Sequence, residues 1–360
     1  MNVGIVGAGI MGRMLSWHLA RDGHAVALFD RDDVRSDSER KSAAGYTAAG
    51  MLTPYAELES AEPMIFDLGM RSLDLWPQIM ADLGISDAYF QEGSLVVAHP
   101  NDRADYERFK SHVGSKLASK DIAHAEIDRS RIDELEPELS SQFHQAMYFS
   151  EESWLRSGQV MDALLEGSTK VGCTSYPKSE VTELQAGFVV ANSIKYRFDY
   201  VIDCRGLGAK ADIQNLRGVR GELIWLEAPD VHINRLVRLM HPRYGLYLVP
   251  QKQDNLFIVG ATQIESDDAG EMTVRSAMEL LSAAYSIHPG FGEARIVQMK
   301  TNCRPALADN LPTIENQDGL IRVNGLFRHG YLLAPALAME VVNLINETDH
   351  QTASRTAVIN

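Results

Sequence analysis

Three glycines near the start of the chain have the spacing of a dinucleotide-binding turn. They lie in the run Gly7-Ala8-Gly9-Ile10-Met11-Gly12, which follows an apolar, β-branched segment and opens an amphipathic one. In such a turn the first glycine permits the sharp bend, the second lets a pyrophosphate approach the backbone, and the third lets a helix pack closely on the strand. The phosphates then bind free N–H groups at the positive end of the helix dipole.

An acidic residue, Asp30, completes the motif. It follows a second buried strand, predicted at 25–29, and stands eighteen residues after Gly12. A carboxylate at that position accepts a hydrogen bond from the adenosine ribose. The alternative is a tight strand–helix turn followed by a surface aspartate. Strand, glycine turn, helix and acid in this order favour a bound dinucleotide.

The segments after Asp30 distinguish a flavin from a nicotinamide cofactor. Alternating βα units would continue in a nicotinamide enzyme, whereas here a polar stretch is followed by small residues at 42–50 and an amphipathic helix at 61–83. The next buried strand of the nucleotide-binding type comes only at 200–204. A nucleotide domain interrupted by inserted segments is typical of a flavoprotein. The small residues indicate backbone lying against a ligand or another backbone, and a flexible loop is the alternative.

The remaining periodicity predicts a mixed α/β (α+β) fold. The 61–83 helix is expected to break near Pro77, and four short strands between 174 and 198 are expected to form one antiparallel meander. The other predicted helices cover 10–22, 101–113, 159–171, 273–285 and 331–345. The other predicted strands cover 2–6, 94–98, 222–226, 247–250, 256–260 and 321–324.

Composition excludes several classes of partner. The 360-residue chain is 45% hydrophobic and carries a formal net charge of −15, which disfavours nucleic acid and anionic membrane surfaces. No apolar run approaches the roughly 20 residues of a membrane-spanning helix, and no basic leader precedes the first strand, so we expect a cytoplasmic protein. Three cysteines without CxxC spacing fit a reducing compartment. No cluster has metal-ligand spacing, and we expect no metal.

Several segments together resemble the glycine oxidase branch of the D-amino-acid oxidase family, along nearly the whole chain. Besides the glycine turn, they are 48–57 (AAGMLTPYAE), 203–209 (DCRGLGA), 247–250 (YLVP), 259–262 (VGAT), 303–306 (CRPA) and 325–335 (GLFRHGYLLAP). The last segment is the most specific, because relatives place the far end of the flavin over it, where the closing helix begins.

The resemblance implies a Rossmann-like FAD-binding domain made of discontinuous segments. A second, substrate-binding domain would cover the flavin with an antiparallel sheet. We expect the first domain to comprise 1–85, 145–217 and 305–360, and the second 86–144 and 218–304. Residues 349–360 are expected to form a flexible tail.

The implied activity is the FAD-dependent oxidative deamination of glycine, sarcosine or a small D-amino acid. The imine product would become glyoxylate and ammonia, while O2 is reduced to H2O2. The branch is tied to forming the thiazole of thiamine, which implies hand-over of the imine to a thiazole synthase, and it suggests a homotetramer. A sarcosine or D-amino-acid oxidase or dehydrogenase, and a non-catalytic flavin-binding maturation partner, remain as alternatives.

The resemblance assigns the substrate-binding side chains. Arg304 would bind the substrate carboxylate in bidentate geometry, with Tyr247 adding its hydroxyl. Arg328 would be a second carboxylate contact or a positive charge near the reduced flavin, so these three are the catalytic candidates. Met51 and Gln263 would line the substrate cavity. Without the resemblance, a salt-bridged arginine and a packed strand tyrosine are the simpler interpretations of Arg304 and Tyr247.

The cofactor contacts follow in the same way. FAD is expected to be bound without a covalent bond, because Cys303 directly precedes Arg304 instead of standing where relatives tether the flavin. His329 is expected to contact the cofactor and to have no catalytic role. The expected FAD contacts are Gly7, Ala8, Gly9, Ile10, Met11, Gly12, Asp30, Arg31, Thr47, Ala48, Ala49, Gly50, Met51, Val181, Cys204, Arg205, Gly206, Arg328, His329, Gly330, Tyr331 and Leu332.

Overall fold

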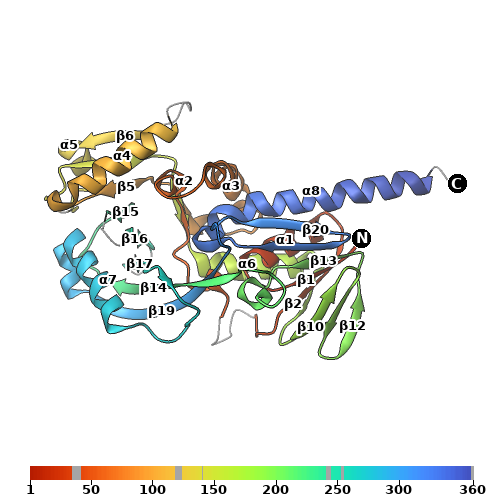
Figure 1. The fold of residues 1–360 in the computed structure, drawn as a ribbon. Helices are drawn as coiled ribbons and strands as arrows, with labels where there is room; N and C mark the ends of the chain where they lie inside the picture. Colours follow the sequence, from red (N-terminus) through yellow and green to blue (C-terminus); the bar gives the residue numbers. More distant parts are fainter. Residues whose placement is uncertain (35–41, 118–123, 140, 241–244, 253–254, 358–360) are drawn as a thin grey trace.

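Two large β-sheets dominate the computed structural model, one at each side of the molecule (Figure 1). The structure describes residues 1–34, 42–117, 124–139, 141–240, 245–252 and 255–357. Within these ranges no helix is both long enough and apolar enough to cross a membrane. The fold is mixed α/β, as the sequence predicts.

The first sheet has six strands in the order β20-β21-β13-β1-β2-β9. Five of them run parallel, and β20 joins the edge antiparallel to β21. The strands are β1 (Asn2–Val6), β2 (Ala25–Phe29), β9 (Thr174–Tyr176), β13 (Tyr200–Asp203), β20 (Thr313–Gln317) and β21 (Leu320–Asn324).

Both faces of this sheet are covered, which explains why its central strands β1, β2 and β13 are largely apolar. On one face Val3 and Ile5 join the core built by the helices α1 (Ile10–Arg21), α3 (Pro63–Asp82), α6 (Ser157–Lys170) and α8 (Gly330–Ala357). On the other face Val6 and Val201 pack against an antiparallel three-stranded sheet of β10 (Val181–Gln185), β11 (Phe188–Ala191) and β12 (Ile194–Arg197).

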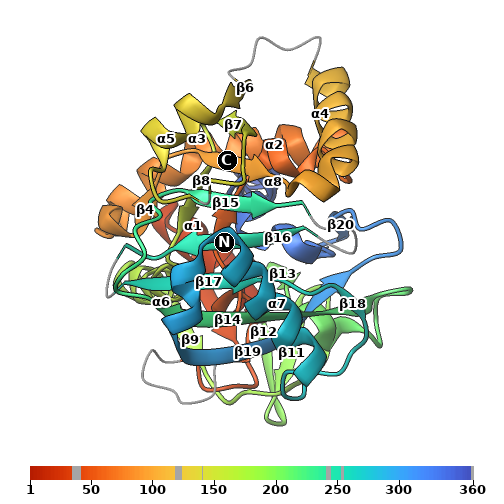
Figure 2. The ribbon, with the colours of Figure 1, turned by 90° about the vertical axis from the view of Figure 1, so that its left-hand side faces the viewer.

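The second sheet has nine strands and is mostly antiparallel. Figure 2 shows β15, β16, β17, β14 and β19 one below the other, with α7 (Val274–Ile287) in front of them. The strands are β5 (Ser94–Val97), β6 (His124–Asp128), β7 (Gln145–Phe149), β14 (Arg217–Glu227), β15 (Leu236–Leu239), β16 (Leu246–Pro250), β17 (Leu256–Gly260), β18 (Ile264–Glu265) and β19 (Arg295–Ala306).

Alternation along these strands divides their side chains between two faces. On β16, Leu246 and Leu248 point into the core that α7 closes, whereas Tyr247 and Val249 belong to a separate cluster on the opposite face. A third sheet of β3 (Met51–Leu52), β8 (Ser153–Leu155) and β4 (Tyr89–Phe90) contributes Trp154 to that cluster. The remaining α-helices are α2 (Pro54–Glu57), α4 (Arg103–Leu117) and α5 (Arg129–Leu135).

Short 3₁₀ helices occur in several of the connections between these elements. The six that lie in the described ranges are η1 (Ala44–Tyr46), η2 (Ser86–Ala88), η3 (Pro100–Asp102), η4 (Gly206–Ala209), η5 (Pro289–Glu293) and η6 (Phe327–His329).

Three sequence expectations are wrong. Helix α3 does not break at Pro77, since its packing along α8 outweighs the lost hydrogen bond, and Trp76 beside the proline donates to the Tyr331 carbonyl at 3.1 Å. Strand β9 leaves the expected meander and extends the first sheet beside β2, where the rings of Phe29 and Tyr176 stack with centroids 4.6 Å apart. Helix α8 extends past the expected end at 345 to Ala357, while residues 358–360 of the expected tail lie outside the described residues.

Candidate active site

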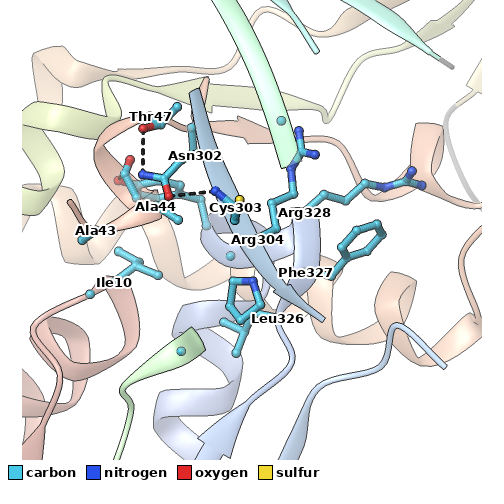
Figure 3. A pocket seen from close by; sticks show the side chains of 18 of the residues that line it. Ile10, Ala43, Ala44, Thr47, Asn302, Cys303, Arg304, Leu326, Phe327 and Arg328 are labelled. Atoms are coloured by element: carbon cyan, nitrogen blue, oxygen red, sulfur yellow. Dashed lines mark hydrogen bonds between the residues drawn. The ribbon is translucent and has the colours of Figure 1, made fainter. Parts of the chain in front are cut away.

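One cavity of about 830 Å³ brings nearly all the predicted site residues together. Its walls come from the carboxyl ends of β1, β2, β13 and β21, where ligands of open parallel sheets bind, and from one face of the second sheet. Every sequence-predicted site residue except Gly12 lines it. Figure 3 shows part of this lining, with the side chains of Arg304 and Arg328 apart from the paired Asn302 and Thr47.

The three glycines of the turn differ in what surrounds them. Gly7 has φ +101°, and a Cβ there would lie 2.6 Å from the Cys204 carbonyl oxygen. A Cβ on Gly12 would lie 1.8 Å from the Gly7 oxygen, so this glycine permits α1 to begin directly against β1. A Cβ on Gly9 would meet nothing within 4 Å, because it faces the cavity. Gly12 is therefore absent from the lining because it has the packing role.

The carboxylate of Asp30 is fixed at the end of β2. One oxygen accepts the backbone N–H of Ala8 at 2.6 Å and the other accepts that of Asp32 at 2.9 Å. The acid thereby connects the glycine turn to the loop that follows β2, and the residue remains on the cavity wall. Each oxygen keeps a further lone pair for a ligand hydroxyl.

The sequence analysis missed Arg13, which lies beside the glycine turn. Its side chain is only 1% exposed and reaches the cavity wall from α1. The guanidinium donates to the carbonyl oxygens of Ala8 at 2.7 Å, Met161 at 2.8 Å and Val34 at 3.1 Å. A buried cation that has no acidic partner among the described residues favours an anion nearby. A lone arginine in an amphipathic helix gave no sequence signal, because such residues are mostly exposed.

The small residues at 42–50 form a wall of the cavity. The 3₁₀ helix η1 lies within this stretch, and all nine residues line the cavity. The Asn302 side chain on β19 donates to the Ser42 carbonyl at 3.0 Å and to the Thr47 hydroxyl at 3.2 Å. Of the two alternatives, backbone lying against a ligand cavity therefore holds for this stretch. Residues 35–41 of the same loop lie outside the described residues.

Two further predicted segments close the same end of the cavity. Arg205, beside Cys204 and Gly206, forms a bidentate pair with the fully buried Asp203 at 2.9 and 2.8 Å. These bonds fix the turn after β13 against the glycine turn. Arg31 and Val181 line the cavity from the loop after β2 and from the first residue of β10.

At the other end of the cavity Arg304 has no acidic partner among the described residues. From β19 it donates to the carbonyl oxygens of Thr262 at 3.2 Å and Arg220 at 3.5 Å. Burial lowers its pKa and nearby Arg328 lowers it further, while Tyr247 and Glu57 raise it. The side chain lies over Gly221, where a Cβ would come within 2.3 Å of a guanidinium nitrogen. The simpler interpretation of a salt-bridged arginine therefore does not fit.

Tyr247 belongs to the same part of the cavity. Its ring lies against Gly260 of the neighbouring strand, and its hydroxyl has no hydrogen-bond partner within the described ranges. Burial raises the pKa of this phenol, an effect that Arg304 opposes. The hydroxyl is thus protonated at neutral pH and able to donate. Met51 and Leu223 supply apolar surface beside it.

Arg328 is engaged by protein groups. It forms an ion pair with Glu57 at 2.6 Å, donates to the Ser60 hydroxyl at 2.6 Å, and donates to the predicted substrate residue Gln263 at 3.2 Å. Burial acts to raise the pKa of Glu57, but Arg328, His329 and Arg238 outweigh it and hold that pKa well below its usual range. Sequence analysis missed Glu57 as a site residue although the motif 48–57 ends on it.

The start of α8 forms the floor between the two ends. His329, 4% exposed, approaches Glu57 with Nε2 at 2.9 Å, while its Nδ1 is buried with no partner in the described part of the chain. The Tyr331 hydroxyl donates toward the carbonyl oxygens of Gly45 at 3.0 Å and Ser157 at 2.9 Å. Gly330 and Leu332 complete this wall.

Thiols and metal ligands add little to this site. The Cys303 thiol lies 3.5 Å from the carbonyl oxygens of Ser266 and Asp268, and burial raises its pKa. In the residues that the structure describes, no group of three His, Cys, Asp or Glu side chains could hold a metal ion. The cavity thus pairs a phosphate-type turn at one end with a guanidinium and a phenol at the other.

Comparisons with known proteins were consistent with this geometry. The family model described as FAD dependent oxidoreductase (DAO) matches residues 2–344. A protein of Rhizobium etli, provisionally named thiamine biosynthesis oxidoreductase ThiO, is 38% identical over 341 residues, which cover 95% of each chain. The crystal structure of glycine oxidase from Geobacillus kaustophilus superimposes with a TM-score of 0.85 at 24% identity, over 96% of this chain and 94% of that chain.

A fused relative is also similar over the length of this chain. The bifunctional protein ThiO/ThiG of a Synechocystis species is 25% identical over 357 residues. These residues cover 95% of this chain and 51% of the fused protein.

Proposed function

Because the chain belongs to the DAO family of FAD-dependent oxidoreductases, we propose that this enzyme oxidatively deaminates glycine, with sarcosine and small D-amino acids as further substrates. The observation that carries the proposal is Arg304, a half-buried cation that lines the cavity and whose partners among the described residues are backbone carbonyls. A guanidinium in this state favours a carboxylate ligand, because it offers parallel donors and lacks a counter-charge.

The glycine-turn end of the cavity fits the dinucleotide part of FAD. Gly9 leaves the backbone open, the Asp30 carboxylate is fixed beside it, and buried Arg13 provides positive charge with no acidic partner in the part of the chain that the structure describes. At the α8 end, His329 lines the cavity, and its buried Nδ1 has no hydrogen-bond partner among the described residues. We propose that FAD binds there without a covalent bond, since the Cys303 thiol is directed to two protein carbonyls.

The side chains would act by placement. Arg304 holds the substrate carboxylate and Tyr247 donates its hydroxyl to the same group, which presents Cα to the cofactor. The substrate amine must be unprotonated, since its lone pair stabilises the iminium that forms. Bound FAD would supply the oxidising power, since a flavin can take up the hydride that leaves Cα and return two electrons to O2 as H2O2. Water then hydrolyses the imine to glyoxylate and ammonia.

The name of the Rhizobium etli relative supports a role in thiamine biosynthesis, and we propose that this role is the formation of the thiazole. A protein named ThiO/ThiG joins a ThiO part to a second part in one chain, and hand-over of the imine to a thiazole synthase is the corresponding proposal here. We also propose a homotetramer. Exposed apolar side chains on α7 (Val274, Met278, Tyr285) and on the edge strand β19 (Ile296, Val297) support association between copies.

The test is peroxide formation by the purified, FAD-loaded protein with glycine, sarcosine, D-alanine and D-proline. Peroxide with glycine, equal amounts of glyoxylate and ammonia, and loss of activity in Arg304→Ala are expected. No peroxide with any of these amines, while the flavin remains bound, would leave the non-catalytic flavin-binding partner as the better description. Reduction of an artificial acceptor without peroxide would indicate a dehydrogenase.

A further inference from the structure

Four arginines line the part of the cavity that faces the second sheet, and three of them have acidic partners. Arg328 pairs with Glu57 at 2.6 Å, Arg238 with Glu59 at 2.5 Å, and Arg108 with Asp105 at 2.8 Å. Arg304 is the fourth and has no such partner in the described ranges. Of these four described arginines, Arg304 therefore carries the one positive charge that no described carboxylate compensates.

Of the three acidic partners, Glu57 is closest to the group that binds substrate. Its side chain is 12% exposed and lines the cavity, and its charge acts on both Arg304 and Tyr247. The same carboxylate holds two consecutive residues, Arg328 and His329, at the beginning of α8. The Arg328 guanidinium thus donates hydrogen bonds to the side chains of Glu57, Ser60 and Gln263.

We propose that Glu57 is a specificity-determining residue, which neutralises Arg328 and so restricts the cavity to amines that carry a single carboxylate. The inference rests on the proposed function, because it takes Arg304 as the carboxylate-binding group. A substrate with one carboxylate matches the single free charge. A second carboxylate would lie near Glu57 in a partly dry cavity, where like charges repel far more strongly than in water.

Removing the Glu57 charge would convert Arg328 into a second anion site. Arg328 already reaches Gln263, a residue on the cavity wall, so its donors can turn toward a ligand without a backbone change. A dicarboxylate would then bridge Arg304 and Arg328. The carboxamide of Glu57→Gln retains the size of the side chain and an oxygen that accepts from Arg328.

The experiment measures the dissociation constants of two inert anions, glycolate and malonate, from the change in the flavin absorption of the holoenzyme. Wild type should bind glycolate in preference to malonate. In Glu57→Gln the ratio of the two constants should move toward malonate by at least about tenfold. The control is Glu62→Gln, which removes an equal charge from an exposed residue outside the cavity and should leave the ratio within about twofold.

A double mutant identifies the group responsible. In Glu57→Gln/Arg328→Gln the ratio should return to within about threefold of wild type, because the released cation is gone. An unchanged ratio in Glu57→Gln, or equal weakening of both anions, would overturn the proposal. If Glu57→Gln does not fold, Arg328→Gln decides the matter, since Glu57 would then keep only His329 as an ion-pair partner among the described residues and its charge should weaken glycolate at least about tenfold.

The outcome separates this proposal from the assignment of Arg304. If Arg304→Ala binds glycolate normally, the carboxylate site lies elsewhere and the proposed function loses its main support. A malonate preference that appears in Glu57→Gln would still show that Glu57 controls the charge of the cavity. If both results are negative, both assignments fail.

Discussion

Arg304 and Tyr247 illustrate how strongly the surroundings of a side chain determine the role that it can have. Within the described ranges neither has an acidic partner or a hydrogen bond to another side chain, and both lie over glycines that leave room for them. Their types alone would permit a salt bridge and a packed ring. Their place in the cavity is what supports the proposed carboxylate site.

We predict that Arg304→Ala loses useful affinity for glycine and retains FAD. Removing one partner of a buried, hydrogen-bonded charge pair costs about 2–5 kcal/mol, or several decades in binding. Arg304→Lys should recover only part of this, since an ammonium loses the bidentate geometry. Glycolate titration of the holoenzyme checks both variants, and normal glycolate binding by Arg304→Ala would rule out its role.

Tyr247 should behave as a positioning residue rather than a base. Burial raises the pKa of its phenol, so the hydroxyl is protonated at neutral pH and donates one hydrogen bond. Tyr247→Phe should therefore lose about 1.5–3 kcal/mol, mostly in substrate affinity. Anaerobic stopped-flow reduction of the flavin by glycine separates affinity from rate. A drop of about a thousandfold in the saturating rate, with affinity intact, would identify a base instead.

At the scale of elements, the first βαβ unit was predictable and the strand that carries Arg304 was not. β1 and β2 are largely apolar, α1 has apolar residues at helical spacing, and a glycine turn joins β1 to α1, so pattern alone locates them. The twelve-residue β19 begins with five exposed residues and contains Pro305, and nothing in its composition marks a strand. It forms because β14 pairs with it over nearly its whole length.

The residues of the site also divide into those that the sequence predicts and those that it does not. Residues of the glycine turn follow from spacing, since each has a defined geometric role. Glu57 and Arg13 do not, because their roles arise from partners distant in sequence: Arg328 lies 271 residues from Glu57 and Met161 lies 148 residues from Arg13. Such contacts depend on the tertiary fold, which local patterns do not encode.

Two glycines of one turn should respond differently to the same added methyl group. Gly12→Ala places Cβ against the Gly7 oxygen and should lower the stability of the apoprotein by about 1–3 kcal/mol. Gly9→Ala meets open space in the protein and should leave apoprotein melting nearly unchanged while weakening FAD binding. Apoprotein melting and FAD titration measure the two effects. Equal behaviour of the variants would contradict the separate roles.

At the scale of the whole molecule, a buried carboxyl group in the connection between the sheets should make the stability of the fold depend on pH. Glu152 is fully buried and accepts the Ala56 N–H at 2.8 Å and the Ser94 hydroxyl. Burial raises its pKa to about 7, although Ser94, Ala56 and Arg238 act in the opposite direction. The usual pKa of a glutamate is near 4.5. Between this pH and about pH 7 the folded protein therefore keeps the proton, whereas the unfolded chain has lost it.

The free energy of unfolding should accordingly fall as the pH rises through that range. Glu152→Gln should abolish this fall. We predict that the variant melts above wild type by about 3–6 °C at pH 8, for a difference on the order of 2–3 kcal/mol, and by much less at pH 5. Scans at one rate across this pH range provide the check. A variant that gains nothing between pH 5 and pH 8 would show that Glu152 is ionised in the folded protein.

The cavity walls come from both ends of the chain, and this affects when the protein can acquire its cofactor. Residues from Val6 to Ser60 form one part of the lining, and residues from Asn302 to Leu332 form another. A ribosome adds about 5–20 residues each second, so the glycine turn emerges roughly 15–65 s before the start of α8 is made. Throughout that interval a nascent chain exposes the turn without the rest of its cavity. Flavin loading is thus a step that follows translation, and cellular FAD supply acts on finished chains.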